Sequence, residues 1–504
     1  MKNFKFLLAV FIVFSSFNAC EKIVEGLNED PNNPQSADDR YVLTGAQLAN
    51  VLVQEGEVAR LTGMWSGYFT GYDRQYIGLA QYQTTAGDAD SPWGNLYAGA
   101  VQQSNIIIKS TETTGNLVYR GVAKIIKANA LGTAAAIWGN VPFSEAGDRE
   151  LFPNPAYDNQ ADVYAGIQTL LDEAIAHLTA QSASSINGDI QELSTTQWIK
   201  VAYTLKARYF THVKNYAAAL TAAQSGINSA ADNWVAKHGE SYGQNFNIFY
   251  SFLDYDRAGY MAADDAYLTR LLDPANALYR GNAKTNEDAR LNFYYTKDIY
   301  TSGAYEPNFL SPLWFSYPNG IFGHDSPYIL AGYAENMLIM AEAAVRTNSN
   351  LSVALGHLNN YRAFLAAGGD MNPAYTDPTD LAFIAQYDAY DLADFANGGI
   401  ENADNISQVN ALRREIEAES LRRAMVAEKV AAAKKTADDA QNEQQKEVAR
   451  LQKIQDDLMR ELLSARKVRT TLEQQRALAL LEESQANTAT FTPNQAKIWP
   501  DIGF

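Results

Sequence analysis

Aromatic rings and polar side chains gather in two glycine-rich segments of the chain, and both groups have the chemistry to bind a sugar. Sugar rings present apolar C–H faces that stack on aromatic rings, and hydroxyl groups that need hydrogen-bonding partners. The first cluster consists of Trp65, Tyr68, Tyr72, Arg74 and Tyr76, with Trp93 just beyond it, and the second of Trp314, Phe315, Tyr317 and Asn319. For each single ring, packing in a small loop core is the alternative interpretation.

No set of residues in the sequence predicts catalysis or a cofactor. The histidines are scattered without the spacing of a metal site, at His177, His212, His238, His324 and His357. There is no Gly-x-Ser-x-Gly motif and no phosphate-binding loop. Asp88 and Asp90 could contribute to a calcium site, but the run lacks the spacing of a known calcium loop. A glycosidase pair of carboxylates stays open, because the sequence does not give their separation.

The N-terminus predicts export and a lipid anchor. Lys2 and Lys5 precede an apolar run over residues 6–17, which is too short to span a membrane and is typical of a signal peptide. Cys20, the only cysteine, follows at the place where a bacterial lipoprotein is cleaved and lipidated. We therefore expect a signal peptide over residues 1–19 and contact with a lipid bilayer through Cys20. An ordinary signal peptide with a chance cysteine is the alternative.

The charge of the chain argues against nucleic acid as a partner. The 504 residues include 40 Lys and Arg against 58 Asp and Glu, which gives a net charge of −18 at pH 7. Phosphate backbones require a basic surface, so we expect no nucleic-acid binding. Apolar residues make up 47% of the chain, which is enough for a large core.

Apolar residues recur with the period of an amphipathic helix along most of the chain. Helices are expected over residues 41–52, 99–111, 118–137, 163–178, 196–216, 216–227, 331–346 and 353–365. Helix pairs of this size predict a mainly all-α fold, a superhelix resembling tetratricopeptide repeats. Long aromatic loops are expected over 63–99, 232–305 and 306–325, and such loops are often functional. The predicted organisation is a lipidated tether over 20–40 and a helical ligand-binding body over 41–410.

The C-terminal part differs in composition from the body. Residues 411–483 contain no Gly, Pro, Trp, Tyr or Phe and are rich in Ala, Glu, Lys, Arg, Gln and Leu. This composition predicts a charged long helix or coiled-coil-like segment over 411–485, followed by a tail over 486–504. Two interpretations remain open: a solvated helix that packs on the body, and an arm for self-association or for a partner.

Two charged residues of one expected helix have candidate partners in another. Lys206 and Arg208 lie on a helix that also carries large aromatic residues, which favours buried ion pairs over ligand contacts. Glu335 and Glu342 are two turns apart on one face of a later helix and are the expected partners.

Five blocks of sequence occur in the order found in a known family. They are NEDPNNP at 28–34, WGNVPFSEA at 138–146, YDNQADVY at 157–164, WIKVAYTLKARY at 198–209 and YAENMLIMAEA at 333–343. Together with Cys20 they resemble the SusD/RagB family of outer-membrane nutrient-binding lipoproteins, in its starch-binding-associated subgroup. The resemblance covers about residues 20–361. Beyond it, the charged segment stands where the family has an aromatic-rich stretch.

The resemblance implies a non-enzymatic protein at the outer surface of the outer membrane. Its ligand would be an oligosaccharide, from starch to other glycans, or a peptide. Its partner would be a TonB-dependent transporter of the SusC type, which it would cover as a lid. Two alternatives remain: a lipid-anchored glycoside hydrolase of helical fold, and a scaffold that acts through its C-terminal helix.

The lipid anchor gives a first prediction. Cys20→Ala removes the thiol that would carry the lipid, so the variant should be unlipidated and released from the membrane. Metabolic labelling with a fatty-acid analogue measures this, with Ser16→Ala as a control that keeps the cysteine. Label retained in Cys20→Ala would contradict the prediction.

Overall fold

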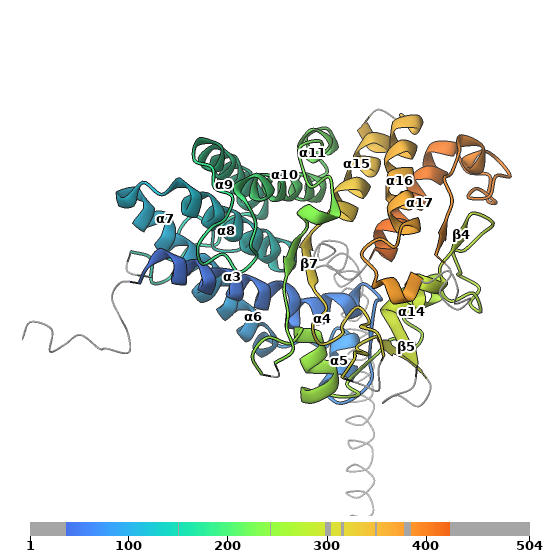
Figure 1. Cartoon of the computed structure of the whole chain (residues 1–504), viewed down its shortest axis with the longest axis horizontal. Coiled ribbons are helices and arrows are strands. Elements are labelled where there is room, and N and C mark those ends of the chain that lie inside the picture. The colour runs from blue at the N-terminus through green and yellow to red at the C-terminus, as the bar shows by residue number, and fades with distance from the viewer. Residues whose placement is uncertain are drawn as a thin grey trace, which may run out of the picture. The chain divides into compact units, whose positions relative to one another are not determined.

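Helices that pack on their neighbours in sequence form the first half of the protein. The computed structural model describes residues 37–149, 151–241, 243–297, 304–313, 317–347, 350–376 and 385–423. The longer helices of the first half are α3 (Asp39–Glu55), α7 (Gln102–Thr114), α8 (Leu117–Trp138), α9 (Gln160–Ala180), α10 (Thr195–His212) and α11 (Tyr216–Ala223). Each of α7 to α11 packs on the next, and α3 covers α7 and α8 (Figure 1).

The series of helices continues into the second half without a break in packing. Helix α15 (Tyr333–Thr347) packs on α11 and pairs with α16 (Leu351–Ala366), and α17 (Gln408–Arg422) packs on α15 (Figure 1). This confirms the predicted helix-pair architecture. All eight helices expected from periodicity are present. The helix expected over 196–216 ends early, at His212, because Lys214 takes a positive φ of 60° there.

Local sequence explains where the helices begin and end. The Asn116 side chain accepts a hydrogen bond from the backbone N–H of Tyr119 and caps the start of α8. Ser194 and Gln197 form a reciprocal capping box at the start of α10. At the other end of α8, Gly139 has φ 78°, a conformation that residues with a Cβ rarely adopt. The sequence WGNVP therefore stops the helix and starts a new segment.

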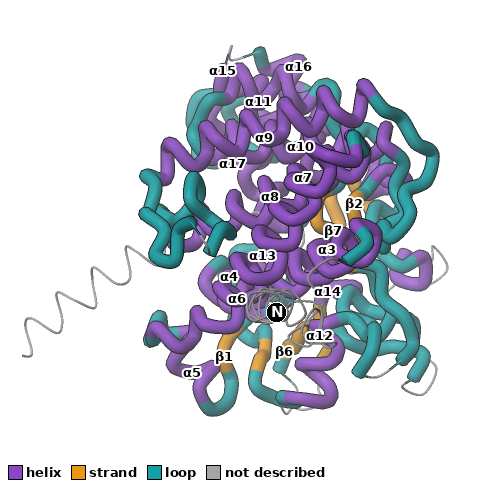
Figure 2. The backbone as a smooth tube through the Cα atoms, turned by 90° about the vertical axis from the view of Figure 1, so that its left-hand side faces the viewer, coloured by secondary structure: helices purple, strands orange, loops and turns teal. Residues whose placement is uncertain are grey.

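The three segments expected as long loops contain short helices and strands. The elements between the long helices are α4 (Glu57–Trp65), β1 (Thr70–Gly71), α5 (Gln75–Ala80), η1 (Ala86–Ala89), α6 (Asp90–Gly94), the π-helix η2 (Asn95–Val101), η3 (Ala230–Asp232), β2 (Trp234–Ala236), α12 (Ile248–Tyr250), the π-helix η4 (Ser251–Asp256), β3 (Met261–Ala262), α13 (Tyr267–Leu272), β4 (Thr285–Asn286), α14 (Asp288–Tyr294), β5 (Tyr295–Lys297), β6 (Tyr305–Pro307) and β7 (Tyr328–Ala331). The elements η5 (Pro373–Thr376), β8 (Gln386–Tyr387) and η7 (Leu392–Phe395) lie between α16 and α17. The strands pair antiparallel as β1–β3, β2–β7, β4–β8 and β5–β6, and Figure 2 shows them as short stretches among helices and loops.

Two hydrophobic clusters form the core of the described part. The first joins the helices from α3 to α10 with the aromatic residues of the short elements, and the second joins α11, α15, α16 and α17. Close helix packing depends on small residues: a Cβ on Gly132 of α8 would lie 2.2 Å from the Tyr209 ring of α10. Aromatic residues of the expected loops are therefore largely core residues, because their rings fill the space between the short elements.

Arg208 and Glu335 form a buried ion pair between α10 and α15. Arg208 Nε lies 2.6 Å from one carboxylate oxygen and Nη2 lies 2.7 Å from the other, with both side chains almost fully buried. This confirms that Arg208 is a buried-pair residue and that Glu335 pairs with one of the two bases. For Lys206 and Glu342 the expectation is wrong: Lys206 contacts Asp172 of α9, and Glu342 pairs with Arg346 one turn along its own helix. Their side chains point to those nearer partners.

Helix α17 belongs to the body, although it crosses the boundary expected at residue 411. Ala411, Leu412 and Ile416 are fully buried in the second hydrophobic cluster. Its last turn carries Arg422, which contacts Glu287 of the α14 region, and Glu419, which contacts Arg290. These four side chains are completely buried. The predicted charged segment therefore starts as a core helix, and its part beyond residue 423 lies outside the described residues, as do residues 1–36 with Cys20.

The Arg208–Glu335 pair gives a stability prediction. Glu335→Ala leaves the Arg208 charge buried without its carboxylate, and such a loss costs about 3–5 kcal/mol. We expect the free energy of unfolding in urea to fall by that amount for the protein lacking residues 1–20. Asp404→Asn is the control, because Asp404 forms an exposed pair with Arg414, and such pairs contribute about 0–1 kcal/mol. Equal effects in the two variants would contradict the prediction.

Candidate functional site

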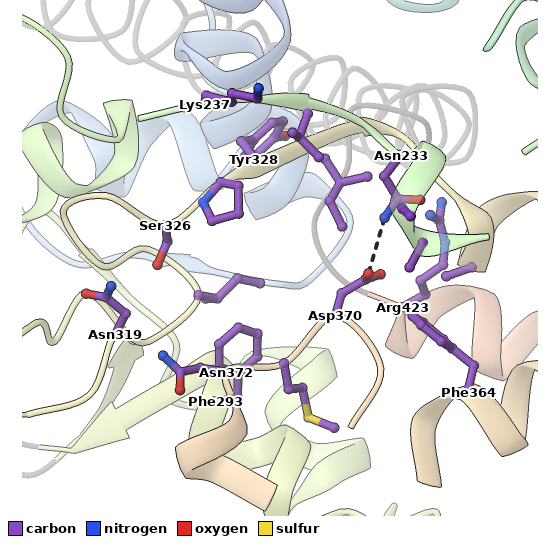
Figure 3. A pocket seen from close by; sticks show the side chains of 18 of the residues that line it. Asn233, Lys237, Phe293, Asn319, Ser326, Tyr328, Phe364, Asp370, Asn372 and Arg423 are labelled. Atoms are coloured by element: carbon purple, nitrogen blue, oxygen red, sulfur yellow. Dashed lines mark hydrogen bonds between the residues drawn. The ribbon is translucent and has the colours of Figure 1, made fainter. Parts of the chain in front are cut away.

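A cavity of about 730 Å³ lies beside the β2–β7 strand pair. Its lining combines apolar side chains with amides and charged groups from segments far apart in the sequence (Figure 3). The apolar part is Phe293, Ile321, Phe322, Val235, Ile329, Leu365 and Met371. Asn319 and Asn372 lie on one side and Asn233, Asp370 and Arg423 on the other. Apolar walls with a few convergent polar groups are typical of a small-molecule site of this size.

The strand pair positions one wall of this cavity. Strand β2 pairs antiparallel with β7, so that Val235 is opposite Ile329 and Ala236 is opposite Tyr328. The register shifts between Trp234 and Val235, as in a β-bulge. Antiparallel pairing brings the segment that follows β2 next to the segment that precedes β7. The cavity wall is thus made by residues about 90 positions apart.

Besides Asp325, charged groups stand at two places around the cavity. Lys237 forms an ion pair with Glu192 at one place. At the other, Asn233 Nδ2 donates a hydrogen bond of 3.2 Å to Asp370, and Arg423 is nearby (Figure 3). Asp370 is an exposed residue, but protein atoms crowd its carboxyl group, and this partial loss of water raises the pKa of Asp370. The Arg423 charge and the Asn233 hydrogen bond lower the pKa by a smaller amount. The cavity can therefore offer both charged and amide partners to a polar ligand.

A second cleft, of about 480 Å³, surrounds Trp93. The Trp93 ring lies 4.6 Å from Tyr97, 5.2 Å from Trp138 in an edge contact, and 6.3 Å from Tyr157 with the two planes 23° apart. Tyr157 is 65% exposed and Phe152 is 37% exposed. The π-helix η2 begins directly after α6, which carries Trp93, and π-helical turns occur often at functional sites. This cleft offers accessible ring faces, which the larger cavity does not, since most of its rings are buried.

Hydrogen bonds to Asp158 fix the turn that forms one side of this cleft. The Asp158 carboxylate accepts bonds from the backbone N–H of Phe143 and of Ser144, at 2.8 and 2.9 Å, and from the Ser144 hydroxyl. Desolvation raises the pKa of Asp158, but these bonds outweigh it and hold the pKa below its ordinary value. The bonds therefore persist at neutral pH and are lost as the pH falls through the lowered pKa.

The structure separates the residues of the two expected ligand-binding clusters. Trp93 lines the smaller cleft and Asn319 the larger cavity. Tyr72 and Arg74 are exposed, and the Arg74 guanidinium lies 5.6 Å from the ring centre of Tyr260. Tyr317 is exposed near Asn319 in sequence. Trp314 and Phe315 lie outside the described residues.

Three rings of the first cluster are engaged in packing. Tyr68 is 2% exposed and Tyr76 is 3% exposed, so the expectation that their rings contact a ligand is corrected: both fill the core. Tyr76 packs on the Phe252 ring at 5.1 Å. Trp65 is half-buried, and its indole N–H donates to the Leu79 carbonyl at 2.9 Å. The sequence pattern of these rings does not distinguish core packing from an exposed binding surface, because it does not show which neighbours cover a ring.

Several lining residues were not singled out from the sequence as ligand contacts. Tyr157 and Phe152 flank two prolines in LFPNPAY, a turn pattern. Because turns and loops lie on the surface, this pattern could have identified the two rings. Asn233, Asn372 and Arg423 of the larger cavity have no local signal. They come together only through tertiary packing.

Comparison with known proteins identifies the family. Residues 31–367 match the SusD-like family whose description is "Starch-binding associating with outer membrane". The chain belongs to this SusD-like family. The sequence-based resemblance is confirmed. Comparison with curated protein sequences found no match.

Solved structures share the fold of this SusD-like protein. A SusD/RagB family protein from Bacteroides thetaiotaomicron is 22% identical, with 81% of this chain and 87% of that chain covered and a TM-score of 0.52. A SusD homolog from Bacteroides uniformis is 18% identical, with 80% and 86% covered and a TM-score of 0.56. At these identities the likeness concerns the fold.

The Asp158 turn gives a prediction for local stability. Asp158→Ala removes the acceptor of the Phe143 and Ser144 amides, so their hydrogen exchange should become faster, by about tenfold for ~1.4 kcal/mol of lost local stability. Mass spectrometry of peptides that cover residues 141–147 measures this. Asp162→Ala is the control, since Asp162 accepts a bond from Asn159 and not from this turn. Unchanged exchange in Asp158→Ala would contradict the prediction.

Proposed function

We propose that this SusD-like protein binds an oligosaccharide outside the cell and delivers it to a TonB-dependent transporter. The observation that carries the proposal is the cleft at Trp93, where an exposed Tyr157 ring lies nearly parallel to the Trp93 ring. The family description, with its starch binding and its association with the outer membrane, supports a carbohydrate ligand and a place at the outer membrane.

The chemistry of the Trp93 cleft suits a sugar chain. Exposed rings stack on the apolar faces of sugar rings, and the partly exposed Phe152 lines the same cleft as Tyr157. Gln102, Arg149 and Asn154 line the same cleft and supply donors and acceptors for hydroxyl groups. A peptide could use the same groups, so a glycan and a peptide are the two ligands to compare.

The anchor and the location form the second part of the proposal. Lipidation at Cys20 would attach the body to the outer membrane, with the ligand sites facing the exterior. None of the helices in the described part is both long and apolar enough to cross a membrane. The resemblance implies that the body covers the transporter as a lid, and the tether expected over residues 20–40 would permit this.

Binding without catalysis is the third part. A glycoside hydrolase would hydrolyse the bound glycan at a measurable rate, and we expect no such turnover. A scaffold that acts through its C-terminal segment would lose its partner on deletion of residues 424–485 and keep its glycan affinity. Such a deletion starts after Arg423, because α17 is part of the core.

The Trp93 cleft is tested by removing single rings. Tyr157→Ala and Trp93→Ala should each weaken glycan binding about tenfold or more, because each removes a stacking surface, and central aromatic contacts contribute on the order of 2 kcal/mol. Calorimetry with starch and other glycan oligosaccharides measures the affinity, and a thermal melt measures stability. Tyr157→Ala is the sharper variant, because its ring is mostly exposed and Trp93 also packs on three rings.

Tyr41→Ala is the matched control, because Tyr41 is 63% exposed and lies outside the cleft. It should leave both affinity and melting temperature unchanged. Asn319→Ala tests the larger cavity in the same way. Loss of affinity in Asn319→Ala alone would move the glycan site there. Unchanged affinity in Tyr157→Ala and Trp93→Ala would reject the cleft.

A further inference from the structure

Three side chains beside the larger cavity form a cluster that neither the proposed glycan site nor the sequence spacing explains. They are Glu240, His324 and Asp325, and one ligand atom from each lies within 4.8 Å of the others. We propose that these residues bind one divalent metal ion of the zinc class. This inference is independent of glycan binding.

The β2–β7 pairing explains why these residues meet. Ala236 at the end of β2 is opposite Tyr328 at the start of β7. Glu240 lies four residues after β2, and Asp325 lies three residues before β7, at the same end of the antiparallel pair. The ion would therefore join the segment that follows β2 to the segment that precedes β7.

The imidazole of His324 is fixed in place and has an unused nitrogen. His324 is 3% exposed, and its ring makes edge contacts with Phe246 at 5.8 Å and Tyr250 at 6.0 Å. Its Nδ1 is buried and has no hydrogen-bond partner among the described residues. A buried polar atom without a partner is costly, and a metal ion would satisfy it. In contrast, His238, which also follows β2, already has a partner: its Nε2 lies 2.9 Å from a carboxylate oxygen of Glu55.

The distance between His324 and Asp325 fits a shared ion. His324 Nδ1 and Asp325 Oδ1 are 3.5 Å apart, which is longer than a good hydrogen bond. With metal–ligand distances of about 2.0–2.2 Å, two ligands of a tetrahedral ion lie roughly 3.4 Å apart. The Glu240 oxygen lies within 4.8 Å of the other two ligand atoms, and Glu240 is exposed, so its side chain can turn toward the ion and leave a path from solvent.

The turn that carries His324 and Asp325 is tightly held. Ser326 Oγ donates to the Gly320 carbonyl at 2.8 Å, and Asn319 Nδ2 donates to Asp325 Oδ1 at 2.5 Å. The Asn319 Oδ1 atom is buried and has no hydrogen-bond partner in the described part of the chain. A Cβ on Gly323 would lie 2.4 Å from this oxygen, so the turn closes directly over Asn319. Asn319 thus positions the Asp325 carboxylate. Both residues line the larger cavity, and Figure 3 shows Asn319 there.

The ligand types select the class of metal. One imidazole nitrogen and two carboxylate oxygens suit Zn²⁺ and similar divalent ions such as Co²⁺, whereas Ca²⁺ and Mg²⁺ prefer oxygen ligands alone. Three protein ligands leave at least one position for water. The sequence spacing hides this site, since Glu240 and His324 are 84 residues apart in the chain.

The test uses tag-free protein lacking residues 1–20 and Zn²⁺ alone. Calorimetry should show one equivalent of bound Zn²⁺, and Co²⁺ should give the visible absorption of a four-coordinate ion. Glu240→Gln, Asp325→Asn and His324→Phe should each weaken Zn²⁺ binding at least tenfold. Glu240→Gln is the decisive variant, because an exposed side chain can be changed without loss of folding, which circular dichroism verifies.

Asp404→Asn is the control carboxylate, exposed and paired with Arg414, and should bind Zn²⁺ as the unchanged protein does. Three results would each overturn the proposal: no Zn²⁺ bound below millimolar concentration, binding that is unchanged in Glu240→Gln and Asp325→Asn, or tighter binding of Ca²⁺ than of Zn²⁺. Glycan affinity is measured separately in the Tyr157→Ala variant, so failure of either proposal leaves the other testable.

Discussion

The buried guanidinium of Arg208 holds together the helices and the strand on which the larger cavity depends. Besides its two bonds to Glu335 of α15, it donates to the Leu330 carbonyl of β7 at 2.8 Å. The Tyr209 hydroxyl next to it contacts Asn129 of α8 at 3.2 Å. Desolvation lowers the pKa of Arg208, but the Glu335 charge and the hydrogen bonds to Glu335 and Tyr209 together outweigh it and raise the pKa, so the side chain stays charged. One charge thus fixes α10, α15 and β7 relative to one another.

Strand β7, which Arg208 fixes in place, in turn positions one wall of the larger cavity and the segment that carries two of the proposed metal ligands. Its pairing with β2 sets which residues face each other at the end of the strand pair. A shift of one residue would turn the side chains of the strand to the opposite face. The position of Asp325 relative to Glu240 therefore depends on an ion pair that neither residue touches.

A second buried network of ion pairs joins α17 to α14 and α16. Glu419 contacts Arg290, Arg362 and Arg422, all completely buried. Desolvation raises the pKa of Glu419, but the three guanidinium groups together outweigh it and lower the pKa. Glu401 shows the opposite shift: its pKa is raised, because burial and the Glu415 charge add together. Such a network stabilises the fold only when every partner is present. It explains why a helix with the composition of the charged C-terminal segment is a core helix up to residue 422.

The sequence by itself determined the helices, their caps and the family. Apolar periodicity and short-range signals such as Asn116, Ser194 and Gly139 act within a few residues, so they can be recognised without the fold. The sequence also predicted that Glu335 pairs with a basic residue of the earlier helix, because two charges on apolar helices need each other, but it did not assign Arg208 as the partner. Only the tertiary structure decided that Tyr68 and Tyr76 are buried, that Trp93 and Asn319 lie in different cavities, and that Glu240 approaches His324. These outcomes depend on strand register and on packing between distant segments, which local sequence patterns do not encode.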